Sequence, residues 1–330
     1  MSEEPEAADL ANRPPQAVGV RAPWAAVPAG LRAAVEERLG APVVAADTQS
    51  GGFSPGVAAR LLLADGRRAF VKAVSEAQNP ESPGIHRSEA RNAAGLPAAV
   101  PAPRLLACFD RDGWVVLLFE DVEGRAPVLP WRPAELSRVL AAVGDLAALL
   151  TPSPVDVPPV AEKQAEAFRG WRTIAADHAA GRDDLAGLDP WAAQHLGELA
   201  ELEAGWAAGA AGDTLAHSDL RADNLLVTAD GRVVVVDWPW ACRAARWYDL
   251  LLMLPSVRMQ GGPPPQRLFD THEVAAGADP GAVTAVLAAF TGFLLGHARR
   301  PAPPGLPTLR PFQAAQGRAA LDWLRTRTGG

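Results

Sequence analysis

Residues 215–240 read LAHSDLRADNLLVTADGRVVVVDWPW and set a histidine, four aspartates and an asparagine around two short apolar runs. An Asp-Gly pair between such runs indicates a two-residue hairpin turn, here at Asp230 and Gly231. Counting from that turn places Asn224 opposite Asp237 at the open end of the hairpin. A carboxamide and a carboxylate side by side offer oxygen ligands to a hard cation, so we predict Mg²⁺ as the cofactor.

Asp219 lies five residues before Asn224, on the loop that enters the hairpin, where a general base could stand. A surface hairpin with solvated polar ends explains the same residues without any chemistry. The spacing His217-x-Asp219-x-x-x-x-Asn224, followed by an apolar strand and Asp237, favours the catalytic interpretation.

Lys72 and Lys163 are the only lysines among 31 basic residues, and Lys72 lies in the strand-like run AFVKAV. Alternation places Phe70 and Lys72 on the same face of that strand. A lysine there could bind nucleotide phosphates if a carboxylate held it, and Glu89 follows seventeen residues later in a segment with helical spacing. The alternative is a lysine that extends to solvent from a sheet edge.

Two backbone segments could bind the rest of a nucleotide. The loop SGGFSPG lets backbone amides approach phosphates, although an ordinary flexible turn fits it equally well. Its candidate residues are Gly51, Gly52, Phe53 and Ser54. The apolar strand WVVLLFEDV ends near Gly124, and the backbone from Glu120 to Val122 is a candidate hinge for an adenine edge.

The pattern along the chain divides it into three parts. Residues 1–18 are acidic and proline-containing, which predicts a disordered tail. Residues 19–124 are rich in strand signals, with Asp-Gly turns at residues 65–66 and 112–113, and form the predicted nucleotide-binding lobe. Residues 125–330 have mainly helical periodicity and form the predicted C-terminal lobe, with the catalytic loop and the acceptor pocket.

Bulk composition excludes several classes of protein. A net charge of −7 over 330 residues argues against a general nucleic-acid binder. Two distant cysteines favour a reducing compartment, and the N-terminal residues lack the features of a secretory signal. We therefore expect a cytoplasmic protein with no membrane partner, either a monomer or a homodimer.

The order of these parts resembles the aminoglycoside phosphotransferase and choline kinase family, a branch of the protein-kinase-like fold. The resemblance covers roughly residues 40 to 330 and is most specific in HSDLRADN, VVVVDW and WYDL. It implies an α+β, bilobal fold. A small antiparallel β-sheet lobe with one helix would precede a larger, mainly helical C-terminal lobe.

Carried over by matching positions, the resemblance implies that Asp219 is the catalytic base and that Asn224 and Asp237 bind Mg²⁺. Lys72 would bind the phosphates of ATP or GTP, with Glu89 as its partner. The reaction would transfer the γ-phosphate to a hydroxyl of an amino sugar, an aminoglycoside-like compound or another hydroxylated metabolite.

The supporting residues show where this chain departs from its relatives. His217 would fix the catalytic loop, and Asp249 in WYDL would have an architectural role. Ser218 occupies a position that is often glycine in the small-molecule enzymes. Trp238 and Pro239 replace the Phe-Gly that follows the metal aspartate in protein kinases, and no APE sequence follows. These departures favour a small-molecule acceptor.

Three other functions remain compatible with the fold: a nucleotide-binding pseudokinase, a protein kinase and a nucleotidyl transferase. A pseudokinase would have lost the base, the lysine or a metal ligand, and each is present. Residues 281–330 carry six arginines against the single acid Asp322. If that segment faced the pocket, it would repel a polycationic acceptor and favour a neutral or anionic one.

Overall fold

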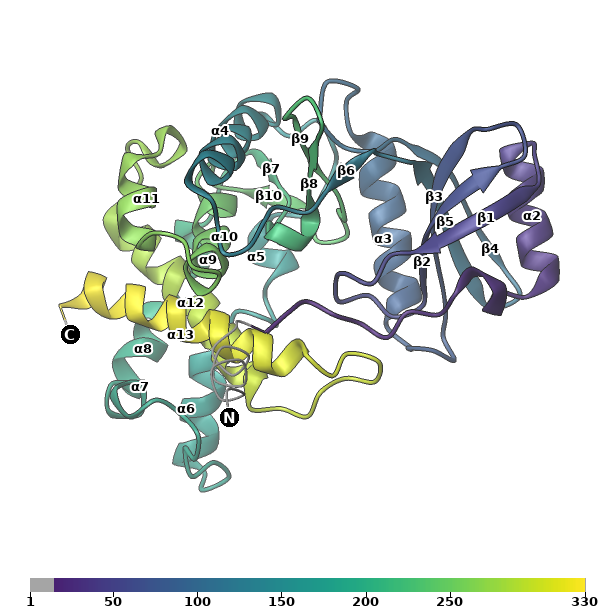
Figure 1. The fold of residues 1–330 in the computed structure, drawn as a ribbon. Helices are drawn as coiled ribbons and strands as arrows, with labels where there is room; N and C mark the ends of the chain where they lie inside the picture. Colours follow the sequence, from purple (N-terminus) through teal and green to yellow (C-terminus); the bar gives the residue numbers. More distant parts are fainter. Residues whose placement is uncertain (1–14, 330) are drawn as a thin grey trace, which may run out of the picture.

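The computed structural model describes residues 15–329, and it has a sheet-rich N-terminal part beside a larger helical C-terminal part (Figure 1). The first 14 residues of the predicted disordered tail lie outside the described residues. Ala17 and Val18 belong to the same predicted tail, yet Gly52 N–H donates to the Ala17 carbonyl at 2.9 Å and Val18 forms bridges with Gly51 and Gly52. The disorder prediction is therefore wrong for these two residues, because their backbone groups pair with a neighbouring loop.

The N-terminal part contains a five-stranded antiparallel sheet with the order β1-β2-β3-β5-β4. The strands are β1 Val43–Thr48, β2 Val57–Leu63, β3 Arg68–Ser75, β4 Leu105–Arg111 and β5 Trp114–Glu120. Asp112 and Gly113 have φ of 50° and 76° and form the tight β4–β5 turn that the Asp-Gly pair predicts. The predicted antiparallel sheet is confirmed.

Each face of this sheet packs against a helix. Val71 and Ala73 of β3 lie in an apolar cluster with Leu31 and Val35 of α2 Ala29–Leu39. Phe70 faces the other way and packs on the cluster that includes Ala90 of α3. The N-terminal part thus has two α-helices, α2 and α3 Ser82–Gly95, and not the one that the resemblance implies. Alternation along β3 directs Lys72 toward α3.

A short three-stranded sheet connects the two parts, in the order β6-β8-β9. Its strands are β6 Gly124–Arg125, β8 Leu225–Thr228 and β9 Val233–Val235, and β7 Thr214–Ala216 pairs separately with β10 Cys242–Ala244. Because β6 pairs with β8, the segment that leaves the N-terminal sheet enters the C-terminal part beside the catalytic hairpin.

The predicted hairpin register is wrong by one residue. Val227 pairs with Val233, and Thr228 N–H donates to the Arg232 carbonyl, so the loop has three residues. Gly231 alone in this loop has a positive φ, of 84°, whereas a two-residue type I′ turn needs two such residues. Asn224 consequently lies opposite Val236, whose N–H donates to its carbonyl at 3.0 Å, and Asp237 follows one residue later.

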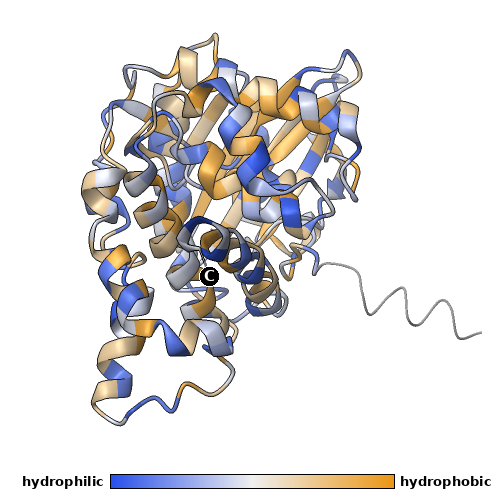
Figure 2. Cartoon of the chain, turned by 90° about the vertical axis from the view of Figure 1, so that its left-hand side faces the viewer, coloured by the Kyte–Doolittle hydropathy of each residue, from blue (hydrophilic) through white to orange (hydrophobic). Residues whose placement is uncertain are grey.

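The C-terminal part is mainly helical, as predicted. Its helices are α4 Pro133–Leu149, α5 Val160–Lys163, α6 Gly170–Ala179, α7 Pro190–Gln194, α8 Leu196–Ala204, α9 Trp206–Gly209, α10 Tyr248–Met259, α11 Pro265–Thr271, α12 Pro280–Ala298 and α13 Leu309–Thr328. Within residues 15–329, 3₁₀ turns lie at Trp24–Ala26, Ala222–Asn224 and Glu273–Ala275. Strands are largely orange in Figure 2, whereas surface helices mix blue and orange residues.

Helix α12 is apolar enough and long enough to cross a membrane by composition, with a mean hydropathy of 1.6. In the structure, however, it packs against α6, α8, α9 and α13, and 61% of its apolar window is buried. Val286, Leu287 and Ala288 belong to the main apolar cluster of the C-terminal part. The structure therefore uses α12 as a core helix.

Helix α3 is attached to the segment that follows β9. Asn92 Nδ2 donates to the Trp238 carbonyl at 2.7 Å, and Ser88 Oγ donates to the Pro239 carbonyl at 2.9 Å. His86 lies on the same helix, is 2% exposed, and has Nδ1 3.1 Å from the Ser82 carbonyl. Burial, with a contribution from the charge of Lys72, lowers the pKa of His86 from 6.5 to about 4.

We predict that His86 makes folding stability fall in mild acid. Between pH 6.5 and 4 the unfolded chain binds a proton at His86 that the folded chain does not, so the free energy of unfolding decreases as pH falls through this window. Denaturant unfolding at pH 7.5 and 5 should show about 2 kcal/mol more loss in the wild type than in His86→Gln. An equal loss in both proteins would mean that His86 does not contribute.

Candidate active site

Lys72 brings three elements together. Its Nζ lies 2.7 Å from Glu89 Oε1 on α3 and 2.9 Å from Asp237 Oδ1 after β9. The predicted pair of Lys72 with Glu89 is present, and the contact with Asp237 adds a link to the C-terminal part. Lys72 and Glu89 are 14% and 4% exposed, whereas Asp237 is 32% exposed and so remains open to a ligand.

The charges in this cluster depend on one another. Burial disfavours the ammonium, but Asp237 and Glu89 together hold the pKa of Lys72 above its ordinary value. Burial also opposes the charge of Asp237, yet Lys72 keeps the pKa of this carboxyl below its usual range. Glu89 is the more buried acid, and burial raises its pKa. The stable arrangement is therefore a positively charged Lys72 beside a negatively charged Asp237.

The predicted catalytic loop, residues 217–224, is held by hydrogen bonds that its backbone N–H groups donate. Asp249 accepts from the N–H groups of His217 and Ser218, at 2.7 and 2.8 Å. The buried His217 ring lies 3.0 Å from the Val236 carbonyl through Nε2, and its Nδ1 accepts from Asp219 N–H at 3.2 Å. These contacts require a neutral ring with the proton on Nε2, in agreement with burial, which lowers the pKa of His217.

Ser218 shows why glycine suits the middle position of this loop. Its φ is 69°, in the left-handed region that glycine adopts without strain. Its Oγ lies 3.1 Å from Sγ of Cys242 on β10. The strained backbone points the two N–H groups of the loop at Asp249, and this fixes the start of the Asp219 segment.

Both oxygens of the Asp219 carboxylate have partners. Asn224 Nδ2 donates to Asp219 Oδ2 at 3.2 Å and to the Asp219 carbonyl at 2.8 Å, and Arg221 Nη1 contacts Oδ1. Arg221 also pairs with Asp223 at 2.8 Å. Burial raises the pKa of Asp219 to about 7 although the charge of Arg221 lowers it. A carboxyl with that pKa can accept a proton near neutral pH.

Asn224, directly before β8, and Asp237, shortly after β9, have the oxygen ligands that Mg²⁺ needs. Because both hydrogen bonds that the Asn224 side chain makes to the described residues use Nδ2, its Oδ1 is available as a ligand. Asp237 uses Oδ1 for Lys72, which leaves Oδ2. Residues 15–329 contain no group of three or more His, Cys, Asp and Glu placed to hold a metal. Two protein oxygens with water and phosphate ligands fit Mg²⁺.

The loop with Gly51, Gly52, Phe53 and Ser54 lies against the catalytic loop and α13. The Phe53 ring meets the Phe312 ring edge-on, with centroids 5.1 Å apart. The Arg221 guanidinium lies over both rings, 5.5 Å from one centroid and 5.6 Å from the other. Sequence reasoning missed Arg221 and Phe312. Arg221 lies inside the quoted HSDLRADN, but nothing in the sequence indicates Phe312.

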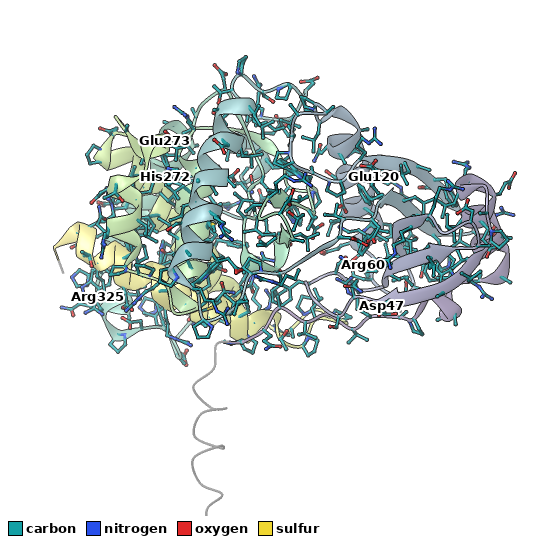
Figure 3. The ribbon with its side chains drawn as sticks, turned by 45° about the horizontal axis from the view of Figure 1, so that its top comes forward. Asp47, Arg60, Glu120, His272, Glu273 and Arg325 are labelled. Carbon is teal, nitrogen blue, oxygen red and sulfur yellow. The ribbon has the colours of Figure 1, made fainter. Side chains whose placement is uncertain are left out.

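The candidate hinge is held by arginine side chains. The Val122 carbonyl accepts from Arg60 Nη2 at 2.8 Å, and the Glu120 side chain accepts from Arg104 Nε at 2.8 Å. The Asp121 carboxylate is 2% exposed and lies 3.3 Å from Arg60 Nε. Figure 3 labels Arg60 and Glu120 at the end of the sheet that faces the helical part. The Val122 carbonyl is therefore occupied by Arg60, and the Glu120 N–H donates to the Arg104 carbonyl at 3.0 Å, so a base would have to pair with Asp121 or with the Val122 N–H.

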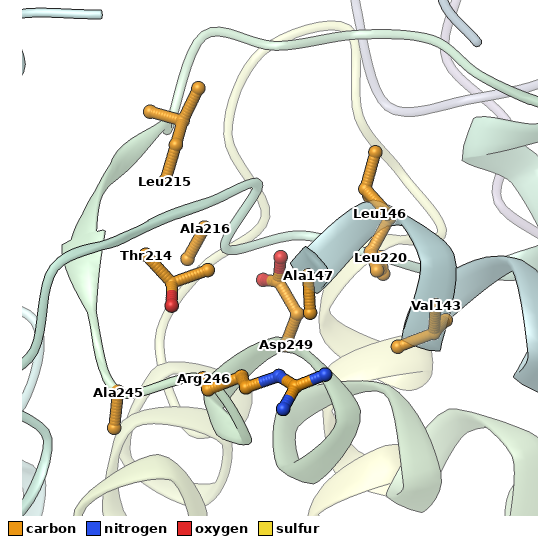
Figure 4. A pocket seen from close by; sticks show the side chains of 10 residues that line it. All are labelled: Val143, Leu146, Ala147, Thr214, Leu215, Ala216, Leu220, Ala245, Arg246 and Asp249. Carbon is orange, nitrogen blue, oxygen red and sulfur yellow. The ribbon is translucent and has the colours of Figure 1, made fainter. Parts of the chain in front are cut away.

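A cavity of about 10 Å³ lies behind the catalytic loop. Leu220, Ala216 and Asp249 line one side of it, and Val143 of α4 lines another (Figure 4). This volume holds at most one water molecule, so it is no binding site for a substrate. The tight packing supports the position of Asp249.

We predict that Ser218→Gly keeps or slightly raises stability, whereas Ser218→Val lowers it by about 2 kcal/mol, because a β-branched residue is strained at a positive φ. Denaturant unfolding measures both, with Ser137→Val on the exposed face of α4 as the control for a β-branched change. If the Gly and Val variants lost equal stability, the contact with Cys242 and not the backbone would determine the effect.

Solved structures with the same overall fold include several small-molecule kinases. A thermostable mutant of aminoglycoside phosphotransferase APH(4)-Ia, in ternary complex with ADP and hygromycin B, is 15% identical, with a TM-score of 0.58 and coverage of 91% of this chain and 99% of that chain. Choline kinase LicA from Streptococcus pneumoniae is 11% identical, with a TM-score of 0.57 and coverage of 89% and 100%. At these identities the likeness shows the fold alone.

The sequence itself gives the family. No curated protein matches the chain significantly. The sequence model described as "Phosphotransferase enzyme family" matches residues 50–290, which include the loop at Gly51, Lys72, Asp219 and Asp237. The chain therefore belongs to the phosphotransferase enzyme family and is a small-molecule phosphotransferase with an alcohol group as acceptor and a kinase-like α+β fold.

Proposed function

We propose that this phosphotransferase transfers the γ-phosphate of ATP or GTP to a hydroxyl of a small metabolite, with Asp219 as the catalytic base. The proposal rests on the contact between Lys72 Nζ of the sheet and Asp237 Oδ1, at 2.9 Å. In the neighbouring loop, Asn224 Nδ2 donates to Asp219 Oδ2 at 3.2 Å. In this proposal, Lys72 is the cation that binds phosphate, Asp237 is the metal ligand and Asp219 is the base.

In this proposal each part of the cleft has one task. Lys72, oriented by Glu89, binds the nucleotide phosphates, and the loop that contains Phe53 covers them. The backbone from Glu120 to Val122 binds the base of the nucleotide. Asn224 and Asp237 would hold Mg²⁺, which neutralises phosphate charge when bound. Related folds have been solved with ADP and with AMP, which supports a nucleotide co-substrate.

Asp219 would orient the acceptor hydroxyl and accept its proton. Burial raises the pKa of Asp219 to about 7, so the carboxylate is a stronger base than an exposed aspartate while still partly ionised at neutral pH. The hydrogen bond from Asn224 fixes the rotation of the carboxylate. Most of the rate acceleration would come from this positioning, because phosphoryl transfer needs little covalent work from the protein.

The competing functions lack support in this cleft. A pseudokinase is disfavoured because Lys72, Asp219, Asn224 and Asp237 are all present, and they contact one another in two pairs, Lys72 with Asp237 and Asn224 with Asp219. The family match disfavours a protein kinase.

We further propose a cytoplasmic enzyme, monomeric or homodimeric, without a nucleic-acid or membrane partner. The free thiols of Cys108 and Cys242 support the cytoplasmic location, and the burial of α12 supports a protein without a membrane partner.

The charge of the acceptor is better judged from ion pairs than from arginine counts. Arg299 pairs with Asp183, Arg325 lies over Trp191, and Arg327 bonds to Gln266. These arginines are held by neighbours in the C-terminal part, so the expected repulsion by the whole segment does not follow from the structure.

Acids on the helical part are also compensated. A groove of about 870 Å³ runs along α6 and the end of α12. Its ion pairs are Glu166 with Arg169, Asp177 with Arg182, and Asp183 with Arg299. A polycation therefore finds few uncompensated carboxylates there, and at the base itself it meets Arg221. We propose a neutral, singly charged or anionic hydroxylated acceptor.

We predict that kcat/KM for a neutral sugar or anionic hydroxylated acceptor exceeds that for a kanamycin-like polycation by about 10-fold or more, because each added positive charge near Arg221 is unfavourable. Steady-state kinetics on matched acceptors at two salt concentrations measure this. A micromolar-range KM for the polycation that rises steeply with salt would contradict the proposal.

We predict that Asp219→Asn lowers kcat by about 10²- to 10⁴-fold, the usual contribution of a general base, and leaves nucleotide affinity nearly unchanged. Asp237→Asn should reduce both turnover and metal-dependent nucleotide affinity, because Asp237 contacts Lys72 and is the proposed metal ligand. The acceptor for these assays comes from screening nucleotide consumption against hydroxylated metabolites. Asp230→Ala, on the exposed hairpin loop, is the control. Near-native turnover in Asp219→Asn would show that Asp219 is not the base.

A further inference from the structure

Arg21 lies outside residues 50–290, which the family model matches, and it contacts the loop at residues 51–56. The segment before it runs alongside the loop at residues 51–56, where Arg21 forms a parallel bridge with Gly56 and Ala22 N–H donates to the Gly56 carbonyl at 2.9 Å. Gly56 has a φ of 93°, and a Cβ there would lie 2.5 Å from the Ala73 carbonyl. The contact therefore fixes the segment against a part of the loop that only glycine can form.

The side chain of Arg21 lies against the backbone of this loop. Its Nη2 donates to the Gly51 carbonyl at 2.7 Å, and Nη1 donates to the Ser54 carbonyl. Nη2 is also 3.3 Å from the position that a Cβ on Gly52 would take. A guanidinium has five N–H groups, and these two bonds leave three of them unused.

The charge of Arg21 has no carboxylate partner within residues 15–329. Its Nε is buried and makes no hydrogen bond to the described residues. Burial lowers the pKa of Arg21, and the nearby charge of Asp237 raises it. Arg21 in turn contributes to the lowered pKa of His86 on α3. The guanidinium is therefore a partly buried cation held at the loop of residues 51–54, with N–H groups that its two hydrogen bonds do not use.

We propose that Arg21 binds a phosphate oxygen of the nucleotide beneath the loop at residues 51–56. This inference rests on the proposed use of a nucleoside triphosphate. A guanidinium suits the task because its planar fork donates two hydrogen bonds to one phosphate group. Nη1 and Nη2 each keep one N–H group that the bonds to Ser54 and Gly51 do not use, and a phosphate oxygen can accept from these groups, whereas protein atoms cover Nε. Together with Lys72, Arg21 places cations on both sides of the cleft, one from the sheet and one from the N-terminal segment.

The competing explanation is that Arg21 only orders the loop through the Gly51 and Ser54 carbonyls. Loss of loop order alone would also weaken phosphate binding, but it would leave the salt dependence of Mg-ATP binding unchanged, whereas loss of a contact between a cation and a phosphate reduces that dependence. Binding experiments on the full chain at two salt concentrations therefore separate the two roles. Calorimetric titration of wild type, Arg21→Gln and Arg21→Lys would use Mg-ATP, inorganic tripolyphosphate and, by competition, adenosine. Arg67→Gln is the matched control, because Arg67 lies in the same part of the chain and pairs with Asp65 on a turn. Thermal melting checks that each variant is folded.

We expect Arg21→Gln to weaken Mg-ATP and tripolyphosphate about 10- to 100-fold, the effect of losing a hydrogen bond to a charged group, and to leave adenosine unchanged. Arg21→Lys should recover part of the loss, and Arg67→Gln should bind as the wild type does. Equal weakening of adenosine and Mg-ATP, no weakening in Arg21→Gln, or an unchanged salt dependence of its Mg-ATP binding would overturn the role of Arg21 alone. A wild type that binds neither ATP nor GTP would instead overturn the proposed function together with this inference.

Discussion

The ion pairs of Lys72 are the interaction on which the rest of the site depends. A buried ammonium is unfavourable unless carboxylates surround it, and here one comes from α3 and one from the segment after β9. This requirement fixes how the sheet, the helix and the hairpin meet. The bonds from Asn92 and Ser88 to residues 238 and 239 hold α3 to the same segment, so Glu89 and Asp237 reach Lys72 from opposite sides.

Backbone strain supports the second half of the site. Ser218 and Asp237 are both held at positive φ, of 69° and 70°, which is unfavourable for residues with a Cβ. Asp249 stabilises the first through two N–H groups, and Lys72 binds the carboxylate of the second. Strain of this kind persists only where neighbours over-determine the conformation, and here those neighbours, Asp249 and Lys72, are residues of the proposed site.

Local patterns in the sequence were sufficient to predict much of this arrangement. Alternation in AFVKAV predicted the face of Lys72, and helical spacing predicted that Glu89 could reach it. The hairpin register failed because an Asp-Gly pair allows either a two- or a three-residue loop, and only the backbone of Asp230 distinguishes them. Contacts between Phe53 and Phe312 or between Arg21 and Ser54 join segments far apart in the chain. No periodicity reports such pairs, because tertiary packing alone creates them.

Arg221 connects the loop that carries Phe53 with Asp219, the proposed base. Its guanidinium pairs with Asp219 and Asp223 and also lies against the rings of Phe53 and Phe312. Movement of the loop that carries Phe53 would therefore uncover one side of the Arg221 guanidinium, which pairs with Asp219. Since Arg221 is 13% exposed, its attraction for Asp219 is weakly screened by water while the rings cover it. In the proposed mechanism, the loop at residues 51–54 would thus influence, through Arg221, the charge environment in which the acceptor hydroxyl loses its proton to Asp219.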